Sequence, residues 1–167
     1  MTAPFLFQLS LFSATLLCAL VAGLILGFAV VVMPGIRRLE DREFLRAFKV
    51  MDGVIQNSQP LFMFVWLGSI LAVVATLALG IGNTSGLSQL LLFAATLLYL
   101  LGVQLPTFRF NIPLNNQIQR LDLDTMEANE LRDARETFEP NWNRWNQFRT
   151  VVSCISVGLM LALIFRL

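Results

Sequence analysis

Polar side chains cluster at the ends of long apolar segments, and these are the residues whose types could carry chemistry. The set comprises Arg109, Asn111, Asn115, Trp142, Trp145, Asn146 and Arg149. An arginine guanidinium forms forked hydrogen bonds to an oxygen ligand, and the amides supply further donors and acceptors. If the helix ends converge, the set predicts a pocket for a small, flat, partly apolar molecule, aromatic or quinone-like.

A purely structural interpretation of the same residues stays open. Arginine and tryptophan are common anchors at a membrane interface, and asparagine often caps helices or bridges them. Arg149 is the hardest to explain in this way, because it stands at the head of an apolar segment and needs an acceptor inside the protein. The two alternatives are therefore a ligand site and a set of anchors.

Metal and haem chemistry has few ligands available in this chain. It contains no histidine, which excludes histidine-dependent haem, zinc and copper sites, and we expect neither a metal nor a cofactor. The two cysteines lie at different depths. Cys18 is about fifteen residues, or roughly 22 Å, from the end of its segment, whereas Cys154 is about one turn into its own. We expect both thiols to be free and buried.

General acid or base chemistry would fall to a carboxylate, and the candidates are Asp52, Glu136 and Glu139. Each lies in a charge-rich stretch, so a solvated surface role is the expected one. The chain has neither a glycine-rich phosphate loop nor a serine triad. With 12 basic and 11 acidic residues it is nearly neutral, which argues against nucleic acid as a partner.

The elements that must position these residues are helices that cross a lipid bilayer. Hydrophobic residues make up 56% of the 167 residues. Residues 5–33, 60–81, 87–105 and 150–165 carry no charged side chain, and about 20 apolar residues suffice to cross the hydrocarbon core. We predict an all-α fold, a four-helix transmembrane bundle that residues 1–167 form as a single domain. The first segment lacks a basic leader and a cleavage pattern, so we interpret it as a retained helix.

The charges predict the topology of the bundle. Every charged residue except Arg166 lies in residues 37–52 or 109–149, the first and third connections between apolar segments. Of the 12 basic residues, all but Arg166 are on this side, so the positive-inside rule makes it cytoplasmic. Both termini and the turn at residues 80–86 would then lie outside.

The two charged connections have the pattern of amphipathic helices. Phe44, Phe48, Met51 and Ile55 recur at spacings of three and four residues, as on one face of a helix. We predict a helical cap on the cytoplasmic side, formed by residues 37–57 and 113–149.

Two features should interrupt the helices of this region. Asparagines and Pro113 favour a turn or an N-cap at residues 110–116 over a continued helix. The last helix should start near residue 128 and run into the membrane, since Leu131, Phe138 and Trp142 share one stripe. Pro140 lies within that stretch and predicts a bend or a fresh helix start.

Four elements of the sequence together resemble the anthrone-oxygenase-like family of small membrane proteins. They are Gly23 and Gly27 followed by Met33-Pro34-Gly35, the amphipathic run to Asn57 and Pro60, residues 111–116, and residues 142–150. The resemblance covers almost the whole chain. Most members are small bacterial membrane proteins, which implies a bacterial cytoplasmic membrane. A few fungal and actinobacterial members are linked to oxidation of anthrones to anthraquinones without a recognised metal or flavin.

What the resemblance implies is a four-helix membrane fold and, for the activity, a cofactor-independent oxygenase. A deprotonated anthrone is electron-rich enough to react with O₂, so the protein would bind it and stabilise the anion. Asn111, Asn115, Trp145, Asn146 and Arg149 match the family pattern and would supply the donors. The chain has no histidine to act as a base at neutral pH, which leaves a carboxylate or bulk hydroxide for that step.

Two other functions remain open. The protein could be a non-catalytic accessory protein whose cap binds a partner or lipid, or whose Gly and Ala faces assemble a homo-oligomer. A transporter is disfavoured, because the four apolar segments lack mid-membrane charges and the pattern of broken helices.

Overall fold

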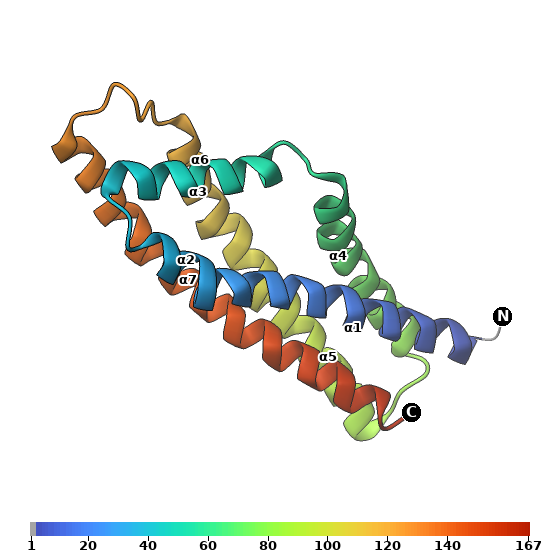
Figure 1. The fold of residues 1–167 in the computed structure, drawn as a ribbon. Helices are drawn as coiled ribbons and strands as arrows, with labels where there is room; N and C mark the ends of the chain where they lie inside the picture. Colours follow the sequence, from blue (N-terminus) through green and yellow to red (C-terminus); the bar gives the residue numbers. More distant parts are fainter. Residues whose placement is uncertain (1–2) are drawn as a thin grey trace.

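The protein is a bundle of four long helices with a helical cap across one end (Figure 1). The structure is a computed structural model that describes residues 3–167, and no strand occurs among them. Four continuous helical stretches, Pro4–Ile36, Pro60–Gly80, Gly86–Arg120 and Ala128–Ile164, are long and apolar enough to cross a membrane. The predicted all-α transmembrane bundle is confirmed, and the chain is an integral membrane protein.

The first and third stretches are helical throughout, although their hydrogen-bond pattern changes along the way. The first consists of α1 (Ala3–Gly27), the π-helical turn η1 (Phe28–Val32) and α2 (Met33–Ile36). The third consists of α5 (Gly86–Leu97), the π-helical segments η2 (Leu98–Gln104) and η3 (Thr107–Asn111), and α6 (Ile112–Arg120). Such π turns are rare and occur often at functional sites.

The other elements are α3 (Asp41–Gln56), α4 (Pro60–Gly80) and α7 (Ala128–Ile164). Local signals mark where they begin. Gln59 accepts a hydrogen bond from the main chain of Phe62, and Pro60 occupies the first turn of α4. Glu127 and Glu130 form a capping box at the start of α7, close to the predicted start.

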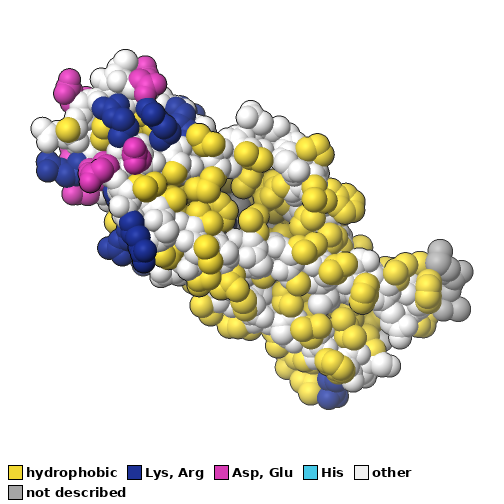
Figure 2. Space-filling view, viewed as in Figure 1, with side chains coloured by type: hydrophobic (Ala, Val, Ile, Leu, Met, Phe, Trp, Pro, Cys, Tyr) yellow, Lys and Arg dark blue, Asp and Glu magenta, His cyan; other side chains and the backbone are white. Residues whose placement is uncertain are grey.

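The four spans close a ring. Helix α1 packs against α4 and α7, α7 packs against α5 and η2, and α4 contacts α5. Gly102 marks a close approach between the third span and α7, since a Cβ atom there would lie 2.5 Å from Cγ1 of Val152. The membrane core centres on Tyr99, Leu11 and Val73, which are all buried. Outward-facing leucines and phenylalanines cover much of the surface in Figure 2, as lipid contact requires.

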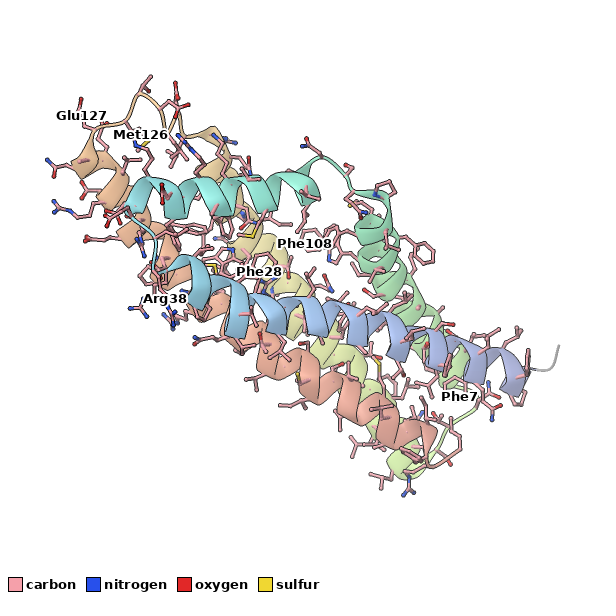
Figure 3. All side chains as sticks on the ribbon, in the orientation of Figure 1. Phe7, Phe28, Arg38, Phe108, Met126 and Glu127 are labelled. Atoms are coloured by element: carbon pink, nitrogen blue, oxygen red, sulfur yellow. The ribbon has the colours of Figure 1, made fainter. Side chains whose placement is uncertain are left out.

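The cap covers the end of the bundle opposite both termini (Figure 1). Helix α3 packs there against α6 and the start of α7. Its core is aromatic: the Phe48 ring lies 4.5 Å from that of Phe138 and 5.4 Å from that of Trp142, centroid to centroid. Figure 2 shows that charged side chains of both signs gather over this end. Arg38, Met126 and Glu127, labelled in Figure 3, lie there.

The turn expected at residues 110–116 does not form. The chain stays helical there, because Pro113 falls in the first turn of α6, where its missing N–H is tolerated, and Asn111 occupies the N-cap position without a side-chain capping hydrogen bond. Helix α7 continues through Pro140, so the fresh helix start is excluded and a bend there stays a prediction. The carbonyl that loses a donor there belongs to Glu136, and both residues are exposed, so water can replace the missing bond.

The cysteines are both free, and they differ in exposure. Cys18 is buried in the core, as expected, whereas Cys154 is exposed on the outer face of α7. The expectation for Cys154 was wrong because apolar surroundings in a membrane protein include the lipid-facing surface.

Candidate functional site

A cavity of about 310 Å³ lies where the bundle meets the cap, within the size range of small-molecule pockets. Helices α1, α3, α4 and α7 and the segments η2 and η3 contribute to its walls. Figure 2 shows the surface hollowed between α4 and the neighbouring α1 and α3. Apolar and aromatic side chains form most of the lining, among them Leu20, Leu24, Phe28, Phe48, Phe62, Met63, Trp66 and Trp142.

Two aromatic groups contribute to the walls of this cavity. On α4, the indole of Trp66 stacks on Phe62, with centroids 6.0 Å apart, and lies 5.4 Å from the ring of Phe108. In the other group, Phe28 of η1 lies 5.7 Å from Trp142 of α7, centroid to centroid. Phe28 and Phe108 are both labelled in Figure 3. Walls of this kind suit a flat apolar molecule.

Arg149 is the central cation of the site. Its residue is only 7% exposed, at the point where α7 enters the apolar bundle. Nη1 donates to Oγ1 of Thr107 at 2.8 Å, and Nη2 donates to Oδ1 of Asn146 at 2.9 Å. No carboxylate in residues 3–167 lies within 4.0 Å of it. Arg149 is therefore a buried charge that neutral groups hold in place, which is unusual unless a ligand supplies the counter-charge.

Three buried polar atoms in the described part of the chain have no hydrogen-bond partner: Nε of Arg149, Nε2 of Gln104 and Oδ1 of Asn111. All three residues line this one cavity. Each has its other polar atoms engaged, since Gln104 accepts from Trp66 at 2.9 Å and Asn111 donates to the carbonyl of Trp142. Buried polar atoms are rarely left unpaired, so the cavity offers two donors and one acceptor to a ligand.

A second polar group lies on the cap side of the same cavity, around Asp52. Asp52 is 3% exposed, so the expectation of a solvated surface role was wrong for this carboxylate. Oδ1 accepts from the amide of Asn115 at 2.7 Å. Oδ2 accepts from Gln119 at 2.8 Å and from Gln56 at 3.3 Å. No lysine or arginine among the described residues pairs with it.

The other two carboxylates lie outside the cavity. Glu136 is exposed, and Glu139 forms ion pairs with Arg135 and Arg37 at 2.9 and 3.6 Å. Both carboxylates therefore belong to the cap outside the cavity, where Glu139 takes part in a partly buried ion-pair network with Arg135.

Asn115 links Asp52 to the aromatic wall. Its side-chain oxygen accepts a hydrogen bond from the indole N–H of Trp142 at 2.8 Å, while its NH₂ group donates to Asp52. Asn146 has a comparable bridging role at the other end, because it donates to the carbonyl of Ile25 at 3.2 Å. That carbonyl lies just before η1, and the bond ties α1 to α7 beside Arg149.

The structure separates the seven residues that the sequence singled out into two groups. Five of them line the cavity: Asn111, Asn115, Trp142, Asn146 and Arg149. Arg109 is exposed and lies over Phe110, 5.8 Å from the ring centroid. Trp145 stacks on the same Phe110 ring, with the two ring centroids 3.7 Å apart. Arg109 and Trp145 thus belong to an outer face and not to the cavity. A ligand-binding role for the other five stays a prediction.

The cavity also includes polar residues that the sequence prediction left out. Asp52 follows Phe48 by four residues, so it shares the buried stripe of α3, and this spacing could have identified it. Gln104 and Thr107 lie on η2 and η3, where π-helical turns change which residues face inward. No sequence pattern considered above marks those turns.

Fold and cavity together define a class: four-span integral membrane proteins with a small-molecule-sized cavity at one end of the bundle. The family model described as anthrone oxygenase matches residues 51–159. The match covers more than half of the chain, and the protein belongs to the anthrone oxygenase family. The matched range, residues 51–159, includes both polar groups of the cavity, from Asp52 to Arg149. No curated protein and no solved structure matches the chain.

Proposed function

We propose that the protein is an oxygenase that binds an anthrone-like aromatic ketone in the cavity and holds its anion against Arg149 while O₂ oxidises it. The observation that carries the proposal is the buried, uncompensated guanidinium of Arg149 with its free Nε atom. An oxyanion there would accept from Nε and supply the missing counter-charge, a strong type of hydrogen bond.

The remaining unpartnered atoms indicate the chemistry of the ligand. Nε2 of Gln104 would donate to the same oxygen or to a neighbouring one, and Oδ1 of Asn111 would accept from a hydroxyl group. The aromatic walls at Trp66 and Trp142 would stack against fused rings. A hydroxylated anthrone has a carbonyl, hydroxyl groups and three fused rings, and membership of the anthrone oxygenase family favours this substrate class.

The proposed role of the protein is electrostatic. Removal of a proton from an anthrone yields an extended anion whose negative charge rests largely on the carbonyl oxygen. Donors that are already in place stabilise that charge without reorganisation, which is the largest single contribution in many enzymes. The electrons for O₂ come from the substrate anion itself, so the proposed reaction requires neither a metal nor a flavin.

The test uses the purified protein in lipid nanodiscs with 1,8-dihydroxyanthrone. Wild-type protein should consume O₂ and form the anthraquinone in equal amounts, faster than empty nanodiscs do. Arg149→Met should lose binding of the product quinone, which is measured by the quenching of tryptophan fluorescence. The matched control is Arg144→Met, which removes an exposed arginine from the same helix. Equal quinone binding by wild type and Arg149→Met would refute the proposal.

Native mass spectrometry of the gently purified protein tests the accessory alternative. A retained aromatic molecule that is lost in Arg149→Met supports the proposed function. A stoichiometric second polypeptide without a small molecule, together with no O₂ consumption, refutes it and favours an accessory protein.

We further propose that the protein resides in a bacterial cytoplasmic membrane with its cap in the cytoplasm and both termini outside. The charge distribution supports this orientation, since the basic residues other than Arg166 lie in or beside the cap. Cysteines placed at Ser85 and at Thr125 in a cysteine-free background test it in intact cells. A membrane-impermeant maleimide should label Ser85→Cys and spare Thr125→Cys, and the reverse pattern would overturn the orientation.

A further inference from the structure

We propose that Asp52 is the base that removes the proton from the substrate carbon. This inference rests on the proposed function and adds to it the step that creates the anion. In a chain without histidine, a base for that step must be a carboxylate or a hydroxide from solvent. Asp52 is the one carboxylate in residues 3–167 that lines the cavity.

The hydrogen bonds around Asp52 hold it as a carboxylate and leave one acceptor site free. Amide groups of Asn115, Gln119 and Gln56 all donate to it, so both oxygens act as acceptors, as in a carboxylate. A carboxylate has about four lone-pair sites, and these three donors leave one free. No arginine or lysine within 4.0 Å among the described residues competes for that site. Lys49, one turn away on α3, donates to the carbonyl of Leu121 instead.

The spacing of the two charges fits a reaction across a ring. Asp52 is linked through Asn115 to Trp142, and Arg149 follows Trp142 by seven residues on α7. Seven residues span about 10.5 Å along a helix, or two turns. Asp52 and Arg149 both line the cavity, and they are held at points about two turns apart along α7. In an anthrone, the acidic carbon and the carbonyl oxygen lie on opposite sides of the central ring, so two separate residues are needed to reach them.

The step balances as follows. The Asp52 carboxylate takes one proton from the CH₂ carbon, and the C–H electron pair moves through the ring system onto the oxygen beside Arg149. The substrate carbanion adds O₂ and forms a C–O bond to a peroxide. Transfer of the second C–H proton to the terminal peroxide oxygen, with cleavage of the O–O bond, gives the new carbonyl and hydroxide. Hydroxide takes the proton from Asp52 and leaves as water. The sum is CH₂ plus O₂ giving C=O plus H₂O.

Proton removal can be measured separately from oxidation. Under anaerobic conditions in D₂O, wild-type protein in nanodiscs should accelerate the exchange of the CH₂ protons of 1,8-dihydroxyanthrone for deuterium, relative to empty nanodiscs. Asp52→Asn should reduce the protein-dependent exchange about 10²- to 10⁴-fold, the usual contribution of a general base. Its affinity for the product quinone should stay close to that of wild type, because Arg149 is unchanged. Glu136→Gln makes the same chemical change at an exposed site of the cap and should exchange like wild type.

Asp52 also ties α3 to α6, so a second variant protects the test against a folding defect. Asp52→Glu keeps the charge and displaces the carboxylate by one methylene, and a misplacement of about 1 Å can reduce a rate about 10²-fold. Gel filtration and quinone binding report whether each variant is folded. If Asp52→Asn fails to fold, loss of exchange in a folded Asp52→Glu protein supports the assignment.

The outcomes separate this inference from the proposed function. If folded Asp52→Asn protein exchanges and oxidises the substrate like wild type, Asp52 is not the base, and the proposed function stands. If wild-type protein oxidises the anthrone without accelerating exchange, the assignment is likewise overturned. If wild-type protein neither binds the quinone nor consumes O₂, the proposed function itself fails and the assignment falls with it.

Discussion

Replacement of Arg149 by methionine should make the ligand-free protein more stable while it removes ligand binding. The guanidinium is 7% exposed and has no carboxylate partner within 4.0 Å in residues 3–167. The desolvation of an ion in a protein interior costs several kcal/mol even after relaxation. Methionine is unbranched and apolar, so it can fill the space without that penalty.

The opposing terms are small by comparison. Thr107 keeps a hydrogen bond to the carbonyl of Val103 when Arg149 is absent. The side-chain oxygen of Asn146 loses its partner, and one unsatisfied buried acceptor costs about 1–3 kcal/mol. We therefore expect a net stabilisation of about 1–3 kcal/mol in Arg149→Met. A chain of this length shifts its Tm by about 2–4 °C for each kcal/mol.

The assay is thermal unfolding in nanodiscs, followed by circular dichroism, with and without 1,8-dihydroxyanthraquinone. Without ligand, Arg149→Met should melt above wild type, and Arg144→Met should melt like wild type. A saturating ligand at about 1,000 times its Kd should add about 4.1 kcal/mol to the wild type alone and so reverse the order. A lower melting temperature for ligand-free Arg149→Met would refute the reasoning, because it would make Arg149 a structural anchor.

Two further substitutions test the packing that holds the site. Gly102→Ala should lower stability by about 1–3 kcal/mol, because its Cβ would lie 2.5 Å from Val152, whereas Gly158→Ala meets nothing within 4 Å and should melt like wild type. Arg135→Lys should lower stability by about 1–3 kcal/mol, since one ammonium group cannot span the two carbonyls and two carboxylates that the guanidinium binds. The exposed Arg132→Lys is its control, and equal thermal melting of the two arginine variants would contradict this account.

Helices and spans were predictable because their signals are local. A charge-free block such as residues 60–81 is long enough to cross a bilayer whatever surrounds it, and α4 occupies Pro60–Gly80. The three- and four-residue spacing of Phe44, Phe48 and Ile55 likewise predicted the cap helix α3. The turn expected near Pro113 did not form, because the tolerance for proline depends on its position within the helix.

The composition of the site was only partly predictable. Arg109 and Arg149 both stand at the end of an apolar segment, yet one lies on the outside and the other in the cavity. Which side of a helix faces inward after a π-helical segment depends on where the extra residue is inserted, and the polar pattern does not encode this. The same limit applies to Trp145, which stacks on Phe110 outside the cavity, and to Gln104, which lies inside it.

The sequence by itself determined the membrane class, the four spans and the charged cap, because apolar length and side-chain periodicity act within one helix. The tertiary structure decided the environments of Asp52 and Arg149. Asn115 and Gln119 reach Asp52 from 63 and 67 residues away, and Thr107 reaches Arg149 from 42 residues away. Burial creates the environments of the proposed base and the proposed anion site, and burial depends on how the helices pack together.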